Sequence, residues 1–144
     1  MRPAMSVRLI AAFVMFVLSL APAASQTGPT DEDKNALLSA YGGFFYLERC
    51  AAFGAAGQPI SALRATMAQI EKSATAMKME TAAARQQARE KLKSELEMLD
   101  SFVAMRGTMN YAQRDSIGQF CSLFAGLLQS AARHFREADR SAGR

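Results

Sequence analysis

The sequence predicts an all-α protein, an up-down-up-down four-helix bundle in which one disulfide links the first and last helices. Apolar residues recur at intervals of three and four through residues 60–77, 92–103 and 117–135, as they do on the buried face of an amphipathic helix. No stretch shows the alternating apolar and polar residues, rich in β-branched side chains, that are typical of a strand. The third observation is a single pair of cysteines, Cys50 and Cys121, which limits how the helices are arranged.

Residues 1–25 are predicted to be a cleaved secretory signal peptide. Arg2 and Arg8 flank the start of an uncharged apolar run at residues 9–21, and small residues follow this run. The run is shorter than the about 20 residues of a membrane-spanning helix, so we expect no stable membrane insertion after signal cleavage. Residues 26–144 then form a single helical domain that is periplasmic or secreted. The alternative is an uncleaved membrane anchor.

The first helix of this domain has a clear predicted start and end. Thr30 precedes three acidic residues at 31–33, which is typical of a helix N-terminus because the hydroxyl caps free amides and the carboxylates face the positive end of the helix dipole. The helix is predicted to run to about residue 53. Two glycines and a proline within residues 54–59 end it and begin the next helix.

Local signals do not define where helices begin and end within residues 59–106. This stretch contains no glycine, and Pro59 is its single proline. One unbroken helix over it would be on the order of 70 Å long at 1.5 Å per residue. Cys50 and Cys121 lie beyond its opposite ends, whereas a disulfide needs Cα atoms within about 7 Å. We therefore predict a reversal at residues 78–82, two helices on either side of it, and a final helix over about 111–139. The competing interpretation is a long bent helix in a dimer joined by intermolecular disulfides.

The composition argues against several classes of function. Removing Arg2 and Arg8 reduces the formal charge of +4 to +2, which is far from the clustered basic patch of a nucleic-acid-binding protein. The chain has one histidine, His134, and two cysteines that we expect to pair in an oxidising compartment. It therefore lacks the usual groups for nucleophilic or acid–base chemistry, and we expect no enzyme activity, no cofactor and no metal site.

The segment from Tyr41 to Tyr46 carries the main functional prediction. Tyr41, Phe44, Phe45 and Tyr46 accompany two glycines inside the first predicted helix. At 100° per residue, the consecutive rings at 44–46 point around much of the helix, so a helix packed on one face would leave some of them in water. These four residues are our candidates for partner binding. The alternative is a fully enclosed helix in which Gly42 and Gly43 let a neighbouring helix approach closely.

These observations predict an exported helical interaction protein without catalytic chemistry, of the adaptor, immunity-type or chaperone-like kind. Its expected partner is another envelope or secreted protein, or a second copy of itself in a dimer. The alternative function is a small-molecule, haem or metal carrier that uses the interior of the bundle.

Overall fold

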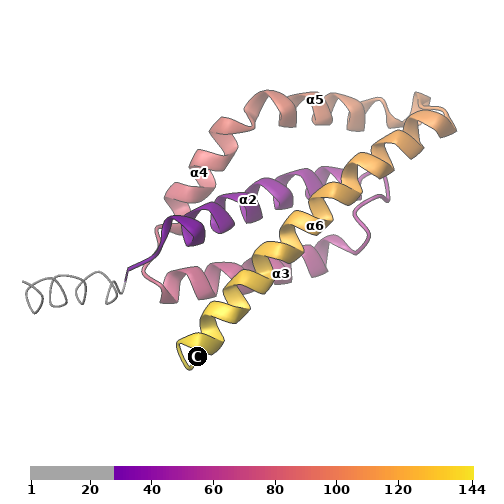
Figure 1. The fold of residues 1–144 in the computed structure, drawn as a ribbon. Helices are drawn as coiled ribbons and strands as arrows, with labels where there is room; N and C mark the ends of the chain where they lie inside the picture. The colour runs from indigo at the N-terminus through magenta and orange to yellow at the C-terminus, as the bar shows by residue number, and fades with distance from the viewer. Residues whose placement is uncertain (1–27) are drawn as a thin grey trace, which may run out of the picture.

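The computed structural model describes residues 28–144, and over this range the chain is all helical (Figure 1). The predicted signal peptide lies outside the described residues. Five α-helices are present between residues 28 and 144, where four were expected, together with one 3-10 turn, η2 (Arg106–Thr108). The α-helices are α2 (Asp31–Ala51), α3 (Ile60–Ala76), α4 (Thr81–Lys91), α5 (Lys93–Ala104) and α6 (Tyr111–Ser141).

Capping boxes fix the starts of α2 and α6, and both helices begin where the sequence predicts. Thr30 Oγ1 accepts a hydrogen bond from the Asp33 amide at 3.1 Å, and Asp33 Oδ2 accepts one from the Thr30 amide at 2.8 Å. Asn110 and Gln113 form the same reciprocal pair at the start of α6, with distances of 2.9 and 3.0 Å. Each box satisfies amides that the helix itself leaves without partners.

The chain reverses between α3 and α4, within the region that the disulfide argument indicated. The Met79 amide donates to the Ala74 carbonyl and the Lys78 amide to the Thr75 carbonyl, both at 3.0 Å, which is the hydrogen-bond pattern of a Schellman motif. Lys78 occupies the left-handed position of this motif with a φ of 64°. Glycine is the usual residue at this position, so no local residue type indicated the turn.

Replacing Lys78 with glycine is therefore expected to stabilise the fold. A side chain with a Cβ is strained in the left-handed region, and glycine removes that strain at the cost of a more flexible unfolded chain. We expect the free energy of unfolding to rise by roughly 0.5–1 kcal/mol, measured by urea denaturation. Lys78→Ala is the control, because it removes the same charge and keeps the Cβ. Equal stabilisation by both variants would contradict the argument from φ.

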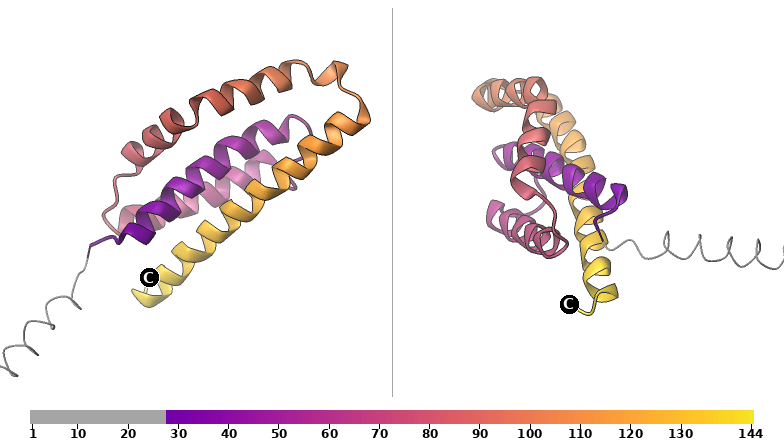
Figure 2. Two further views of the ribbon diagram at one scale, coloured as in Figure 1. Left: turned by 45° about the horizontal axis from the view of Figure 1, so that its top comes forward. Right: turned by 90° about the vertical axis from the view of Figure 1, so that its left-hand side faces the viewer.

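The bend at Leu92 accounts for the fifth helix. Leu92 separates α4 from α5 with a φ of −103° and a ψ of 9°, although no glycine or proline is present there. Both helices pack on α2, but through different residues: α4 buries only Ala88, whereas α5 buries Leu96 and Leu99. In the left view of Figure 2, α2 lies between the α4–α5 segment and α6.

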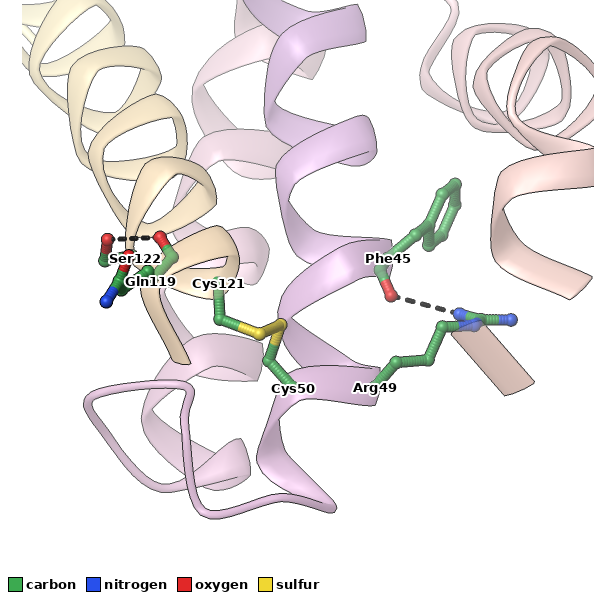
Figure 3. The surroundings of a disulfide bond; sticks show 6 residues. All are labelled: Phe45, Arg49, Cys50, Gln119, Cys121 and Ser122. Atoms are coloured by element: carbon green, nitrogen blue, oxygen red, sulfur yellow. Dashed lines mark hydrogen bonds between the residues drawn. A yellow bond between two sulfur atoms is a disulfide. The ribbon is translucent and has the colours of Figure 1, made fainter. Parts of the chain in front are cut away.

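The predicted disulfide is present between α2 and α6. Cys50 and Cys121 are both buried, and their Cα atoms lie 5.9 Å apart (Figure 3). The bridge spans 71 positions of sequence within one chain, so the unbroken helix with intermolecular disulfides is not the arrangement in this structure. Next to it, the Arg49 guanidinium donates to the Phe45 carbonyl at 3.0 Å and forms an ion pair with Asp100 of α5 at 2.9 Å.

A second long-range link joins the other end of α2 to α6. His134 Nε2 lies 2.7 Å from Asp33 Oδ1, and His134 Nδ1 lies 3.9 Å from Glu32 Oε1. Burial of Asp33 alone would raise its pKa. The hydrogen bonds from Thr30 and His134, together with the positive charge available at His134, outweigh that effect and lower the pKa from 3.8.

This lowered pKa predicts how stability depends on pH. The ionised Asp33 stabilises the fold above its unfolded pKa of about 3.8, and that contribution is lost as the pH falls through the lower, folded value. Asp33→Asn is expected to lower the free energy of unfolding by about 2 kcal/mol at pH 6 and to flatten its decline between pH 5 and pH 2. Asp31→Asn, on a fully exposed neighbour, is the matched control. Parallel pH profiles for Asp33→Asn and the original protein would contradict the prediction.

Candidate functional site

The four aromatic candidates do not form an exposed patch in this structure. Tyr41, Phe45 and Tyr46 are buried, and Phe44 is half-buried against the core. Tyr46 faces α6 and stacks on Phe124, with ring centroids 4.0 Å apart. In the isolated chain α2 is thus the enclosed helix of the alternative interpretation, and partner binding by these four residues stays a prediction.

Polar contacts hold Tyr41 between three helices. Its hydroxyl donates to Glu71 Oε1 of α3 at 2.8 Å, and the same oxygen accepts from Arg85 of α4. The Arg85 guanidinium also lies over the Tyr41 ring, 5.5 Å from its centroid. Burial and the Glu71 carboxylate raise the pKa of Tyr41 to about 12, so the hydroxyl stays protonated at neutral pH. This arrangement docks α4 on α2.

Gly43 allows α2 and α6 to approach closely. A Cβ at Gly43 would lie 3.3 Å from the Phe124 carbonyl oxygen and 3.5 Å from the Leu128 amide nitrogen, both backbone atoms of α6. A Cβ at Gly42 would meet only a methyl group of Leu92, at 3.3 Å. The close approach of the alternative interpretation is present at Gly43, where the neighbour is the α6 backbone, whereas Gly42 faces only the Leu92 side chain.

A groove that Gly42 and Gly43 help to line lies over α2, and we call it the α2–α6 groove. Its volume is about 230 Å³, and its walls come from α2, α4 and α6. Tyr46 and Phe124 line it, and so does Lys91, which is exposed. The other lining residues are Leu38, Ser39, Gly42, Gly43, Gln87, Ala88, Leu92 and Leu127.

Beside this groove, α6 exposes apolar side chains that the core does not use. Phe120, Leu123 and Leu127, which we call the α6 ridge, are 36 %, 67 % and 46 % exposed. Their spacing places them along one side of the helix, next to the buried face that contains Cys121 and Leu128. Sequence reasoning identified the buried face but missed the ridge. The signal was present, because the apolar residues at 120–128 outnumber those that one narrow buried stripe requires.

No metal site is present among the described residues. Between residues 28 and 144, no group of three or more histidine, cysteine, aspartate or glutamate side chains is placed to hold an ion. His134 instead pairs with Asp33, as described above. None of the helices in the same range combines the length and apolar character that a membrane crossing needs.

Comparison of the chain with models of protein families, with curated proteins and with solved structures found no match.

Proposed function

We propose that this protein is an exported helical interaction protein that binds another envelope or secreted protein through the α6 ridge and the adjoining α2–α6 groove. The observation that carries the proposal is the exposure of the ridge, above all of Leu123. Partner binding is thereby assigned to α6, whereas the sequence had suggested the aromatic residues of α2. Tyr46 and Phe124 would support the ridge from beneath.

The energetics favour a covered ridge. Burying a leucine or phenylalanine side chain contributes about 1.5–3 kcal/mol relative to leaving it in water. Three such side chains lie together, and Leu127 belongs both to the ridge and to the wall of the groove. An apolar helix of a partner could lie along the ridge and place one side chain in the groove, as helices do in other grooves of this kind. The exposed Lys91 would favour a nearby acidic residue of the partner.

The proposed location rests on two features. Residues 1–25 have the pattern of a cleaved signal peptide. The Cys50–Cys121 disulfide fits the oxidising environment of the periplasm or the cell exterior. We also interpret α4 and α5 as one bent segment, which makes the course of the chain the up-down-up-down bundle that the sequence suggested.

A photo-crosslinking experiment tests the proposal. A photo-reactive residue placed at position 123 of the exported protein should form a crosslink to one partner, or to a second copy of the chain. The same residue at position 129, an exposed polar site on α6, should form none. Leu127→Glu should abolish the crosslink from position 123, whereas Gln129→Glu should preserve it. Crosslinking that is equal at both positions, or insensitive to Leu127→Glu, would overturn the proposal.

A further inference from the structure

We propose that α4 and α5 form an autoinhibitory strap, which lifts away from α2 and uncovers a row of side chains for an apolar helix of the partner. The strap comprises residues 81–104. The row, which we call the α2 row, comprises Leu38, Tyr41 and Phe45. The inference deepens the proposed function and rests on it for the partner, whereas the opening of the strap is a claim about the isolated protein.

The α2 row has the pattern of a face on which another amphipathic helix packs. Its members are spaced by three and then four positions, so they lie along one side of α2. Leucine and two aromatic residues at this spacing are typical of the apolar seam between two helices. Tyr41 and Phe45 are buried, and Leu38 is partly buried. The row is therefore covered in this structure, and the cover is α4.

The side chains with which α4 covers this row are unusual for the task. The sequence of α4 contains no apolar residue larger than alanine. Exposed arginines lie over the rings instead: the Arg85 guanidinium is 5.5 Å from the centroid of the Tyr41 ring, and the Arg89 guanidinium is 5.1 Å from that of Phe45. Cation–π contacts at exposed sites are weak. An apolar helix in place of α4 would cover the same rings and bury apolar side chains of its own.

Two exposed ion pairs and little apolar burial hold the strap in place. Arg85 pairs with Glu71 of α3, and Asp100 pairs with Arg49 of α2 at 2.9 Å. The side chains of Arg85 and Asp100 are 48 % and 57 % exposed, so both pairs are weak and sensitive to salt. α4 buries one of its 11 residues and α5 two of its 12, whereas α2 buries nine of its 21. Segments with so little buried apolar surface open locally without unfolding the whole protein.

The other three helices are joined to one another independently of the strap. The Cys50–Cys121 disulfide links α2 to α6, and the Ser73 hydroxyl of α3 donates to Asp139 of α6 at 2.6 Å. The strap leaves this body at two turns, one at Lys78 with its φ of 64° and one at residues 105–110. The ends of helices absorb the backbone changes of hinge motions. The strap can therefore move as one unit while α2, α3 and α6 stay together.

Opening of the strap would enlarge the binding site of the partner. In the closed form α4 is one wall of the α2–α6 groove, whose volume of about 230 Å³ admits a side chain but not a helix. An α-helix with its side chains is about 10 Å wide, so it enters only when this wall moves. Leu38 of the α2 row and Leu127 of the α6 ridge line the same groove. A partner helix on the ridge would thus reach the row once the strap has lifted.

Hydrogen exchange of the isolated, oxidised protein, followed by mass spectrometry, tests the opening. Amides of α4 and α5 should exchange about 100-fold faster than those of residues 40–47 in α2, because the strap opens while the body stays folded. Raising NaCl from about 0.05 M to about 1 M should speed exchange in the strap about threefold and leave α2 unchanged. Protection of the strap equal to that of α2 would overturn the proposal.

Arginine variants show whether the strap moves as a unit. Arg85→Gln and Arg89→Gln remove the contacts with the rings, and each should speed exchange about fivefold in α5 as well as in α4, although both substitutions lie in α4. Arg64→Gln, at an exposed arginine of α3, is the matched control and should leave the strap unchanged. Faster exchange in α4 alone would indicate fraying of one helix, and faster exchange in every helix would indicate global destabilisation. Either result would overturn the strap.

A covalent lock tests the role of the strap in binding. A Cβ at Gly42 would lie 3.3 Å from the Leu92 side chain, so Gly42→Cys combined with Leu92→Cys places two thiols close together between α2 and the strap. A methylene bridge between these thiols would hold the strap closed. Partner crosslinking from position 123 should fall about tenfold in the bridged protein relative to its unbridged form, and should rise about threefold in Arg89→Gln.

The outcomes separate this inference from the proposed function. Undiminished crosslinking in the bridged protein would overturn the strap as an inhibitor and leave partner binding by the α6 ridge standing. Absence of crosslinking from the original protein and from every variant would overturn the proposed function, and with it the role of the strap in binding. Hydrogen exchange would still decide whether the strap opens in the isolated protein.

Discussion

Replacing both Cys50 and Cys121 with alanine is expected to lower the free energy of unfolding by about 4 kcal/mol, because the bridge closes a long loop in the unfolded chain. Domains of this size are stable by only about 5–15 kcal/mol, so the variant would be close to unfolding at 37 °C. Urea denaturation monitored by circular dichroism measures the difference. Alanine is preferable to serine, since both sites are buried and a serine hydroxyl would add an unsatisfied polar group.

Reduction of the original protein is the control for this prediction. It should shift the urea midpoint in the same direction as the double alanine variant, and reduction should leave the variant itself unchanged. A loss below 1 kcal/mol in both cases would show that the unfolded chain is already compact enough for the bridge to matter little. A protein that runs as a dimer on a non-reducing gel would instead revive the intermolecular interpretation.

Phe45→Ala is expected to cost about 3–5 kcal/mol, because the ring is buried and its removal leaves a cavity. The substitution also removes two contacts of the ring. Its centroid lies 6.1 Å from the centroid of the Tyr41 ring, and the Arg89 guanidinium lies 5.1 Å from it. Phe44→Ala is expected to cost less than half as much, since Phe44 is only partly buried. Thermal and urea denaturation of the two variants provide the comparison.

This pair of variants also decides how the aromatic segment of α2 is used. If both rings serve the core alone, partner crosslinking through position 123 should persist in Phe44→Ala at temperatures where that variant is folded. Loss of partner binding in a stable Phe44→Ala variant would show that the half-buried Phe44 belongs to the interaction surface. A stability loss below 1 kcal/mol for Phe45→Ala would contradict its place in the core.

Much of the fold could be predicted because its signals are local or covalent. Thr30 and Asn110 begin helices through caps that depend on a few neighbouring residues. The disulfide then required a reversal near residue 78 that no local residue type suggested. The bend at Leu92 could not be predicted in this way, because it depends on how α4 and α5 both pack on α2 and lacks glycine and proline.

The candidate site was harder to predict, since burial depends on contacts between distant segments. The rings of α2 are covered by Arg85 and Arg89 of α4 and by Phe124 of α6, which lie 40 or more positions away. The pairing of Asp33 with His134, separated by 101 positions, likewise leaves no trace in either local sequence. The exposure of the α6 ridge follows from the same packing, because the angle of α6 on α2 decides which of its apolar residues are covered.

The disulfide also determines what happens to this protein when it is cut. Residues 50–121 form a closed covalent ring that contains α3, α4, α5 and the exposed turns between them. A protease that cleaves one peptide bond within the ring therefore leaves a single molecule whose two pieces stay tethered at the junction of α2 and α6. In an environment rich in proteases, a first cleavage in the α3–α4 turn would not release either piece, and the clipped protein could keep its binding surface until the bridge is reduced.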